Sequence, residues 1–391
     1  MQNKTKMPPS RIIGTIISIV LLLIAAMLCG KLGADVAIRR IENRDVYFDS
    51  EAQIYLSLLV PVLIAYYIGY LLQLIVHESG HLVFGLASGY GFASFRIGSF
   101  ILLKGESGFK MKRFSLAGTG GQCIMTPPPM HDGKYPCALY NLGGCIMNLV
   151  VSTAAAVIYI ISSRDTYFSM FMIEFAVMGF YVAVLNGVPL KLGMIDNDGT
   201  NALNLGKNPQ CMRALWSHMM IYTYQAKGYR LRDIPEELFY EPTDDALHDP
   251  TVAGYATAVF QRYVDMGDNE KAIAYAHHIL DTADGILPVH RIALKGELLY
   301  LELTGARDEN VISSLADAEI KRYFRASKLS PSASRTAYAY ALYSGDKKHA
   351  DKYAAQFESI LNKYPFDGEI ALERELFAKT RSITAQTEPL S

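Results

Sequence analysis

Long apolar runs, separated by charged segments, dominate the first half of the chain. Four of them are long enough to cross a membrane as helices, because a span needs about 20 apolar residues and must satisfy its backbone polar groups internally. The runs cover residues 12–30, 54–76, 137–162 and 168–190, and the second continues as helix to about residue 88. This pattern predicts an α-helical, multi-pass protein of the cell membrane, with about four transmembrane helices in the lipid bilayer.

Basic residues beside these runs predict their orientation, because lysine and arginine are retained on the cytoplasmic side. Residues 1–11 hold three of them and residues 91–136 hold six, against one in residues 163–167. Residues 31–53 are less decisive, with four basic residues among five acidic ones. We expect both termini in the cytoplasm.

The polar segment after the second apolar run has an alternating pattern of side chains instead of a continuous apolar one. From Phe92 to about Ser115 it alternates β-branched, aromatic and polar residues around Gly105-Glu106-Ser107-Gly108, which predicts a small β-hairpin. The segment follows the second span directly. We therefore expect the hairpin to lie against the membrane-embedded part, where an exposed edge strand can pair with an extended peptide.

The second half of the chain carries charged residues throughout, as a soluble domain does. Residues 245–391 contain helical stretches broken at Gly267-Asp268, Gly305 and Gly345-Asp346, at separations of 38 and 40 residues. Helix pairs with a fixed period are typical of an α-solenoid, whose concave surface binds peptides or partner proteins. The segment resembles tetratricopeptide repeats, and an ordinary helical domain is the alternative.

Composition excludes several other classes. The net charge is −1 and no basic tract stands out, which argues against nucleic-acid binding. The five cysteines form no CxxC pair, so they indicate neither a thiolate metal site nor a disulfide framework. The first apolar run lacks a small-x-small cleavage signature and further spans follow it, so we interpret it as a span rather than a signal peptide.

A metal-binding motif lies at the end of the second run. His77-Glu78-Ser79-Gly80-His81 is an HExxH sequence, and its i, i+4 spacing on a helix places both imidazoles within reach of one zinc ion. Glu78 lies beside them, where it can take a proton from water and pass it to the leaving amine. A chance match is the alternative, but ionisable residues at the end of a span are functional by default. We therefore expect His77 and His81 as zinc ligands and Glu78 as general base and then acid.

A third protein ligand must come from elsewhere, because tetrahedral zinc with one open position needs three and no histidine or glutamate follows His81 at helical spacing. The best candidate region follows the fourth run. There Asn186 and Pro189 break the helix before two aspartates, Asp196 and Asp198, and irregular backbone can line a cavity. Both aspartates are candidates on this argument.

Three features together resemble the site-2 protease family of intramembrane zinc metalloproteases. They are HExGH on a membrane helix, a small-residue segment with an asparagine, and an NxxP pattern followed by Asp-Gly. In this sequence they are His77–His81, Gly143–Asn148, Asn186 with Pro189, and Asp198 with Gly199. The resemblance implies a three-helix metalloprotease core, here residues 54–202, with HExxH on its first helix and an aspartate ligand on its last.

The resemblance also separates the two aspartates. Asp198 is the one followed by glycine, so we expect it rather than Asp196 to complete the zinc site. It lies farther from the NxxP pattern than is usual in the family, which implies an insertion around residues 191–195. Asp132 is also followed by glycine, but it belongs to the loop before the third span.

Three further polar residues lie in the membrane half. By resemblance, Asn148 has a catalytic role, polarising the substrate carbonyl or holding the substrate strand; a hydrogen bond between helices is the alternative. Glu174 and His131 have no identifiable partner, so we expect both to be solvated.

We therefore expect four parts. Residues 1–53 hold the first transmembrane helix and an external loop, residues 54–202 the intramembrane core, residues 203–244 a linker, and residues 245–391 a soluble, cytoplasmic helical-repeat domain. By resemblance, the protein is a zinc metalloendopeptidase with one Zn²⁺ ion, which cleaves a membrane-spanning or membrane-associated peptide while its repeats bind a protein partner. The alternatives are a membrane-anchored, soluble-type zinc peptidase with a glutamate ligand, and a non-catalytic membrane scaffold.

Overall fold

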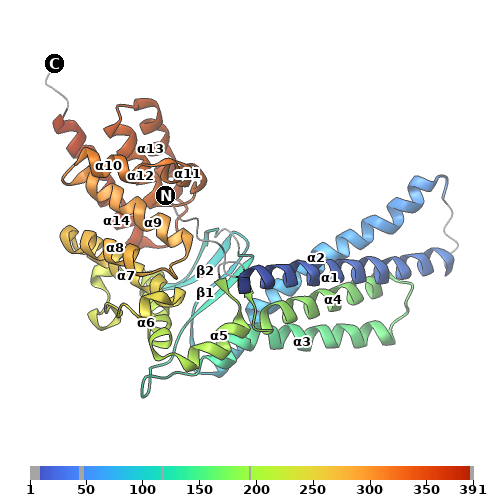
Figure 1. Ribbon diagram of the computed structural model, residues 1–391. Coiled ribbons are helices and arrows are strands. Elements are labelled where there is room, and N and C mark those ends of the chain that lie inside the picture. The colour runs from blue at the N-terminus through green and yellow to red at the C-terminus, as the bar shows by residue number, and fades with distance from the viewer. Residues whose placement is uncertain (1–8, 44–47, 116–118, 193–194, 388–391) are drawn as a thin grey trace. The chain divides into compact units, whose positions relative to one another are not determined.

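The computed structural model describes residues 9–43, 48–115, 119–192 and 195–387 (Figure 1). The chain forms two compact units, and each contains two separate stretches of sequence. The first unit comprises Met1–Phe92 and Gly120–Asn208, and the second comprises Ala93–Thr119 and Pro209–Ser391. The segment between the second and third apolar runs is therefore shared between the units.

Four long apolar helices build the described part of the first unit. They are α1 (Pro9–Asn43), α2 (Glu51–Ala87), α3 (Ala138–Ile161) and α4 (Tyr167–Gly187). They run alongside one another in Figure 1, and each is long and apolar enough to cross a membrane. These helices match the four predicted spans, although α1 continues well beyond its apolar run.

Side chains of this helical bundle are distributed as expected for a lipid environment. Met27 is 74% exposed and Ile161 is 77% exposed, whereas the polar side chains of Gln73, Asn148 and Ser152 are fully buried. Apolar residues outside and hydrogen-bonded polar residues inside are typical of helices that face lipid. The arrangement supports membrane association of the first unit.

Glycines allow α2 and α3 to approach closely at the HExxH motif. A Cβ atom on Gly80 would lie 2.3 Å from the carbonyl oxygen of Gly143, and one on Gly143 would lie 2.7 Å from the oxygen of Gly80. Only residues without a side chain permit this contact between helix backbones. The glycine inside HExGH therefore has a packing role.

A four-stranded sheet replaces the single hairpin that the sequence predicts. Its strands are β1 (Gly91–Ile97), β2 (Phe100–Gly105), β3 (Gly108–Arg113) and β4 (Gly121–Thr126), in the order β3-β2-β1-β4. The predicted hairpin is β2–β3, in which Gly105 pairs with Gly108 across a two-residue turn. Gly108 has a φ of 126°, which only glycine adopts readily.

The hairpin packs within the second unit. Ile101 and Leu103 of β2 are buried against Ala226 and Phe366 of the second unit, and Lys110 of β3 forms an ion pair with Asp367. The β2–β3 hairpin is therefore part of the helical unit. Alternation along the strands predicted the hairpin, but only these long-range apolar contacts decide which unit it joins.

Among the described residues of the second unit, nine α-helices follow. They are α6 (Pro209–Lys227), α7 (Pro250–Met266), α8 (Asn269–Thr282), α9 (Pro288–Thr304), α10 (Glu309–Leu315), α11 (Ala318–Ala326), α12 (Pro331–Tyr343), α13 (Lys347–Leu361) and α14 (Asp367–Thr387). α6 lies in the segment expected as a linker, and its buried residues make it an integral part of the unit. The unit thus begins earlier than residue 245.

The two Gly-Asp turns separate helices as the sequence indicates. Gly267 ends α7 with a φ of 78°, and the Asp268 side chain then accepts a hydrogen bond from a backbone N–H in the first turn of α8. Gly345 has a φ of 72°, and Asp346 caps α13 in the same way. A left-handed glycine followed by an N-cap aspartate is a local signal for a tight helix–helix turn.

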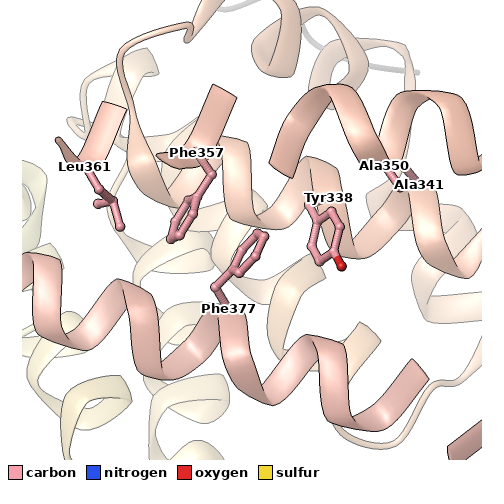
Figure 2. Close-up of a cluster of buried hydrophobic side chains, with 6 residues drawn as sticks. All are labelled: Tyr338, Ala341, Ala350, Phe357, Leu361 and Phe377. Carbon is pink, nitrogen blue, oxygen red and sulfur yellow. The ribbon is translucent and has the colours of Figure 1, made fainter. Parts of the chain in front are cut away.

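Aromatic stacking fills the core between α12, α13 and α14 (Figure 2). The rings of Phe357 and Phe377 are parallel with centroids 4.2 Å apart, and the ring of Tyr338 lies 4.4 Å from that of Phe377. Phe357 is fully buried. Its ring therefore joins the last helix to the preceding pair.

We expect Phe357→Ala to lower the free energy of unfolding of this unit by about 3–5 kcal/mol, because the cavity left behind adds to the lost burial. Trp216, the chain's one tryptophan, lies in α6, so its fluorescence during urea unfolding reports on this unit. Val289→Ala is the control, since Val289 is 54% exposed and should change stability by less than about 0.5 kcal/mol. Equal losses in both variants would contradict the packing described above.

Candidate metal centre

Three side chains converge between α2 and α5 (Asp198–Asn204). Nε2 of His77 lies 3.2 Å from Nε2 of His81 and 3.0 Å from Oδ2 of Asp198. Nε2 of His81 lies 3.4 Å from the same oxygen. Ligand atoms about 2.0–2.1 Å from a tetrahedral ion are separated by about 3.3 Å. The three residues can therefore bind one metal ion.

The tautomer of His81 follows from its hydrogen bond. Its Nδ1 lies 2.8 Å from the carbonyl oxygen of Tyr140 in α3. A carbonyl oxygen only accepts, so Nδ1 carries the proton. In the neutral ring, Nε2 then presents its lone pair to His77 and Asp198.

A network of amides orients His77 in the same way. Asn148 donates its Nδ2 hydrogens to the backbone oxygen and to Oε1 of Gln73, at 2.9 and 2.7 Å. Gln73 in turn donates to the backbone oxygen of Phe175 and to the hydroxyl of Ser152. Oδ1 of Asn148 must therefore accept from Nδ1 of His77, which lies 2.8 Å away. Partners of this kind set the tautomer and direction of a metal-ligating histidine.

The centre thus brings together three acceptors. An ionised carboxylate and two imidazole lone pairs repel one another unless a cation lies between them. The donor set fits a metal ion on this structural ground, independently of the sequence motif.

Asp198 is held in place by its neighbours. Asn197 caps α5, accepting from the backbone N–H of Thr200, and it donates to the backbone oxygens at the end of α4, those of Leu185 and Val188. A Cβ atom on Gly199 would lie 2.1 Å from the backbone oxygen of a residue in α4, so α5 meets that helix end closely. The Asp-Gly pair therefore combines a ligand with a residue small enough for this contact.

The insertion expected before Asp198 is a short antiparallel ribbon. It consists of β5 (Lys191–Leu192) and β6 (Ile195–Asp196), in which Lys191 pairs with Asp196. The side chain of Asp196 lies outside the part of the chain that the structure describes. Asp198 is the aspartate that the structure places with the two histidines.

Glu78 is buried beside the metal ligands, with 7% of its surface exposed. A Cβ atom on Gly121, the first residue of β4, would lie 2.6 Å from Oε1 of Glu78. The start of β4 therefore lies against this carboxylate. The sequence indicated Glu78, but it carried no signal for its neighbour.

Gly144 of α3 lies directly against both imidazoles. A Cβ atom there would lie 2.6 Å from Cε1 of His77 and 2.7 Å from Nε2 of His81. Both distances are shorter than real Cβ contacts, so any side chain at this position must displace a ligand. Like the Gly80–Gly143 contact, this one requires glycine.

We expect Gly144→Ala to weaken metal binding by about 10–100-fold, the range found when residues that orient metal ligands are changed. The measurement is a competition titration of the purified protein with a zinc chelator. Gly30→Ala is a matched control in a membrane helix, because a Cβ atom there would meet nothing within 4 Å. Unchanged zinc affinity in the Gly144 variant would show that α3 does not constrain the ligands.

Glu174 and His131 were both expected to be solvated. His131 is exposed, as expected, but Glu174 is not. Glu174 is fully buried, and its two carboxylate oxygens lack a hydrogen-bond partner among the described residues. A Cβ atom on Gly33 would lie 2.2 Å from Oε1 of Glu174, so α1 covers this carboxyl group. Glu174 is buried because α1 packs against α4. The position of Glu174 near the start of an apolar run does not show that another helix covers it.

The residues that support the ligands carry little signal in the sequence. Gln73 acts on His77 through Asn148, the Tyr140 backbone oxygen accepts from His81, and Asn197 caps the helix that carries Asp198. Gln73 had a signal, since it is a polar residue one helical turn before His77 in an otherwise apolar run. Tyr140 acts through its backbone oxygen, which no sequence pattern indicates.

Comparisons with protein-family models, with curated proteins and with solved structures find no match to this chain. The geometry of the centre and the motif that supplies its residues are therefore the basis for a function.

Proposed function

We propose that the protein is an intramembrane zinc metalloendopeptidase, which hydrolyses a peptide bond in a membrane-spanning or membrane-associated substrate. One observation carries this proposal. His77, His81 and Asp198 converge next to a buried glutamate, in a bundle of helices long and apolar enough to span a membrane. Two neutral imidazoles, one carboxylate and an adjacent general base are the parts that zinc-dependent hydrolysis requires.

The metal would be a single zinc ion held by His77, His81 and Asp198. Three protein ligands leave a coordination position for a reactant, as catalytic zinc sites do. When bound, zinc would act as a Lewis acid that polarises the scissile carbonyl, and it would lower the pKa of a water molecule at the site toward neutrality.

Glu78 is the proposed proton carrier. Its carboxylate accepts a proton from the attacking water as the water oxygen bonds to the scissile carbonyl carbon. It then delivers that proton to the amide nitrogen as the carbon–nitrogen bond breaks, which yields a carboxylate and a free amine. Burial in a bundle that excludes solvent strengthens these electrostatic interactions.

Asn148 takes a positioning role in this proposal, instead of the catalytic role suggested by family resemblance. Both atoms of its amide are engaged, one with His77 and the other with Gln73. The side chain is fully buried. It supports metal binding by keeping Nε2 of His77 directed at the metal.

An extended substrate is proposed to bind along β4. This strand is at the end of the strand order β3-β2-β1-β4, and its first residue lies against Glu78. A peptide that adds a strand to this edge exposes its backbone beside the general base. A helical substrate must unwind before it binds in this way, because the backbone groups that would pair with β4 are engaged in its own hydrogen bonds.

The proposed location is the cell membrane, with both termini and the helical unit in the cytoplasm. The basic residues of positions 1–11 and 91–136 support this orientation. The metal centre lies at the end of α2 that precedes β1, so the orientation also places it toward the cytoplasmic side.

A comparison of membrane proteomes tests the proposal. Cells that carry the wild-type protein or Glu78→Gln at equal abundance are compared for membrane peptides that accumulate intact in the variant. We expect at least one such precursor, with the matching cleaved product only in wild-type cells. Identical proteomes and an unchanged phenotype would instead support a scaffold that acts through its helices.

A soluble-type zinc peptidase with a glutamate ligand is less well supported. In the described part of the chain, the third member of the metal cluster is Asp198. That residue follows a helix long and apolar enough to span a membrane, not a helix of the charged second unit.

A further inference from the structure

A second concentration of polar groups lies inside the helical unit, around a cavity of about 50 Å³. By the same measure a single water molecule needs about 10–15 Å³, so a small polar group fits. The cavity is lined by residues of α6, α7, α9, α12 and α14.

A buried guanidinium forms part of the cavity wall. Arg335 is 1% exposed; its Nε donates to Glu373 at 2.7 Å and its Nη2 donates to both carboxylate oxygens of Glu297 at 2.9 Å. The guanidinium also lies 3.8 Å from the ring centre of Tyr300. Its Nη1 has no hydrogen-bond partner within the described residues. A buried donor without a partner is costly unless a ligand or water accepts from it.

Negative charge is in excess around this arginine. Glu297 and Glu373 already pair with the guanidinium, and the half-buried carboxyl of Glu369 adds a third carboxyl group to the wall. Asp265 does not add to the excess, because Arg230 donates to it at 2.9 Å. Buried charge of one sign is destabilising until an opposite charge arrives.

The ionisation of Glu369 reflects this surplus. Burial raises its pKa to about 7, and the carboxylates of Glu373 and Glu297 add to the rise. The hydroxyl of Tyr364 donates to Oε1 at 2.8 Å and opposes it. A cation beside Glu369 favours the ionised form, so binding such a cation is coupled to release of a proton.

We propose that this cavity binds the lysine or arginine side chain of an extended peptide. The ammonium or guanidinium group offsets the excess negative charge at Glu369, Glu297 and Glu373. The apolar side chains of Leu372 and Phe260, which also line the cavity, contact the aliphatic stem. Nη1 of Arg335 donates to a carbonyl oxygen of the same peptide.

This inference rests on the proposed function for the origin of the peptide. The helical unit is placed in the cytoplasm, where the segments flanking membrane spans are rich in lysine and arginine. The cavity then selects substrates by the basic flank of their membrane segment. The substrate class is a membrane-spanning peptide with a cytoplasmic Lys or Arg close to its span.

Binding of short labelled peptides tests the inference. The full chain carrying Glu78→Gln, reconstituted in uncharged lipid nanodiscs, is titrated against N-acetylated peptides that differ at one position, which holds lysine, arginine or norleucine. Fluorescence anisotropy reports the dissociation constant. We expect the norleucine peptide to bind about 30-fold more weakly or worse, because it keeps the stem and loses a charge that is paired in the bound state.

Two variants locate the binding site. Glu369→Gln should weaken lysine-peptide binding by about 30-fold or more, and it should remove the rise in affinity expected in the parent protein between about pH 6 and about pH 8. Glu358→Gln is the matched control, since Glu358 is an exposed carboxylate of α13 that does not line the cavity. Tryptophan fluorescence verifies that both variants are folded.

Three outcomes would overturn the inference: equal affinity for norleucine and lysine peptides, unchanged affinity in folded Glu369→Gln, or binding of the same peptides only when they are left unacetylated. The last would assign the cavity to a terminal amine. Failure of the proposed function is distinguishable, because absence of proteolysis in the wild-type protein does not affect these titrations. Conversely, proteolysis without charge-dependent binding would refute the cavity's role alone.

Discussion

Asp198→Ala is expected to lower the zinc affinity of the protein by more than about 100-fold. Changing a residue that only orients a ligand costs about 10–100-fold, and Asp198 supplies a ligand atom itself. Without it, two neutral imidazoles remain, and the carboxylate that balances the charge of the ion is lost. The measurement is the zinc content of the purified protein by mass spectrometry, followed by competition with a chelator.

Asp196→Ala is the informative control for this experiment. It lies two positions earlier and has the same side chain, yet the structure brings Asp198 to the histidines. We expect zinc content in the Asp196 variant to match that of the wild type. If neither variant loses zinc, the proposed ligand set is incorrect; if only the Asp196 variant does, the metal site is formed by the other aspartate. The same spectrum identifies the metal, and iron in place of zinc would contradict the proposed cofactor.

Glu78→Gln is expected to lower the rate of peptide hydrolysis by about 10²–10⁴-fold, the usual contribution of general acid–base catalysis. The amide has nearly the same shape as the carboxylate but cannot accept the proton of the attacking water. The rate is measured with purified protein and a precursor identified by the proteome comparison. Since Glu78 is not one of the three clustered ligands, zinc content should stay at the wild-type level.

A matched substitution separates this effect from general damage to the site. Glu106→Gln changes a carboxylate in the β2–β3 turn, where the Tyr229 hydroxyl donates to it, and the rate should be unaltered. Loss of zinc together with activity in Glu78→Gln would make the rate uninterpretable as proton transfer. Full activity with zinc retained would exclude Glu78 as the general base.

Much of the metal centre was predictable because its motif is local. His77 and His81 are one helical turn apart, and an apolar run predicts the helix on which they lie. Asp198 was harder, because 121 residues separate it from His77. Its proximity depends on where α4 ends and on Asn197, which accepts from α5 and donates to the end of α4.

The supporting residues were the least predictable. Asn148 was identified through resemblance, but its partner Gln73 was not. Glu174 lies near the start of a span, where a charged residue is expected to be solvated, yet α1 buries it. In both cases the sequence shows a polar residue, and the packing of another helix determines whether it is solvated, bonded or covered.

The sequence by itself determined the features that arise from short-range physics. Apolar run length specifies the membrane helices, HExxH spacing places two imidazoles on one face, and each Gly-Asp pair ends one helix and begins the next. Tertiary structure alone decided which unit the β2–β3 hairpin joins and that Arg335 lies buried between two carboxylates, and it brings Asp198, expected only by resemblance, to the two histidines. These outcomes depend on contacts between segments far apart in the chain, where packing and burial, rather than local period, set the neighbours of each side chain.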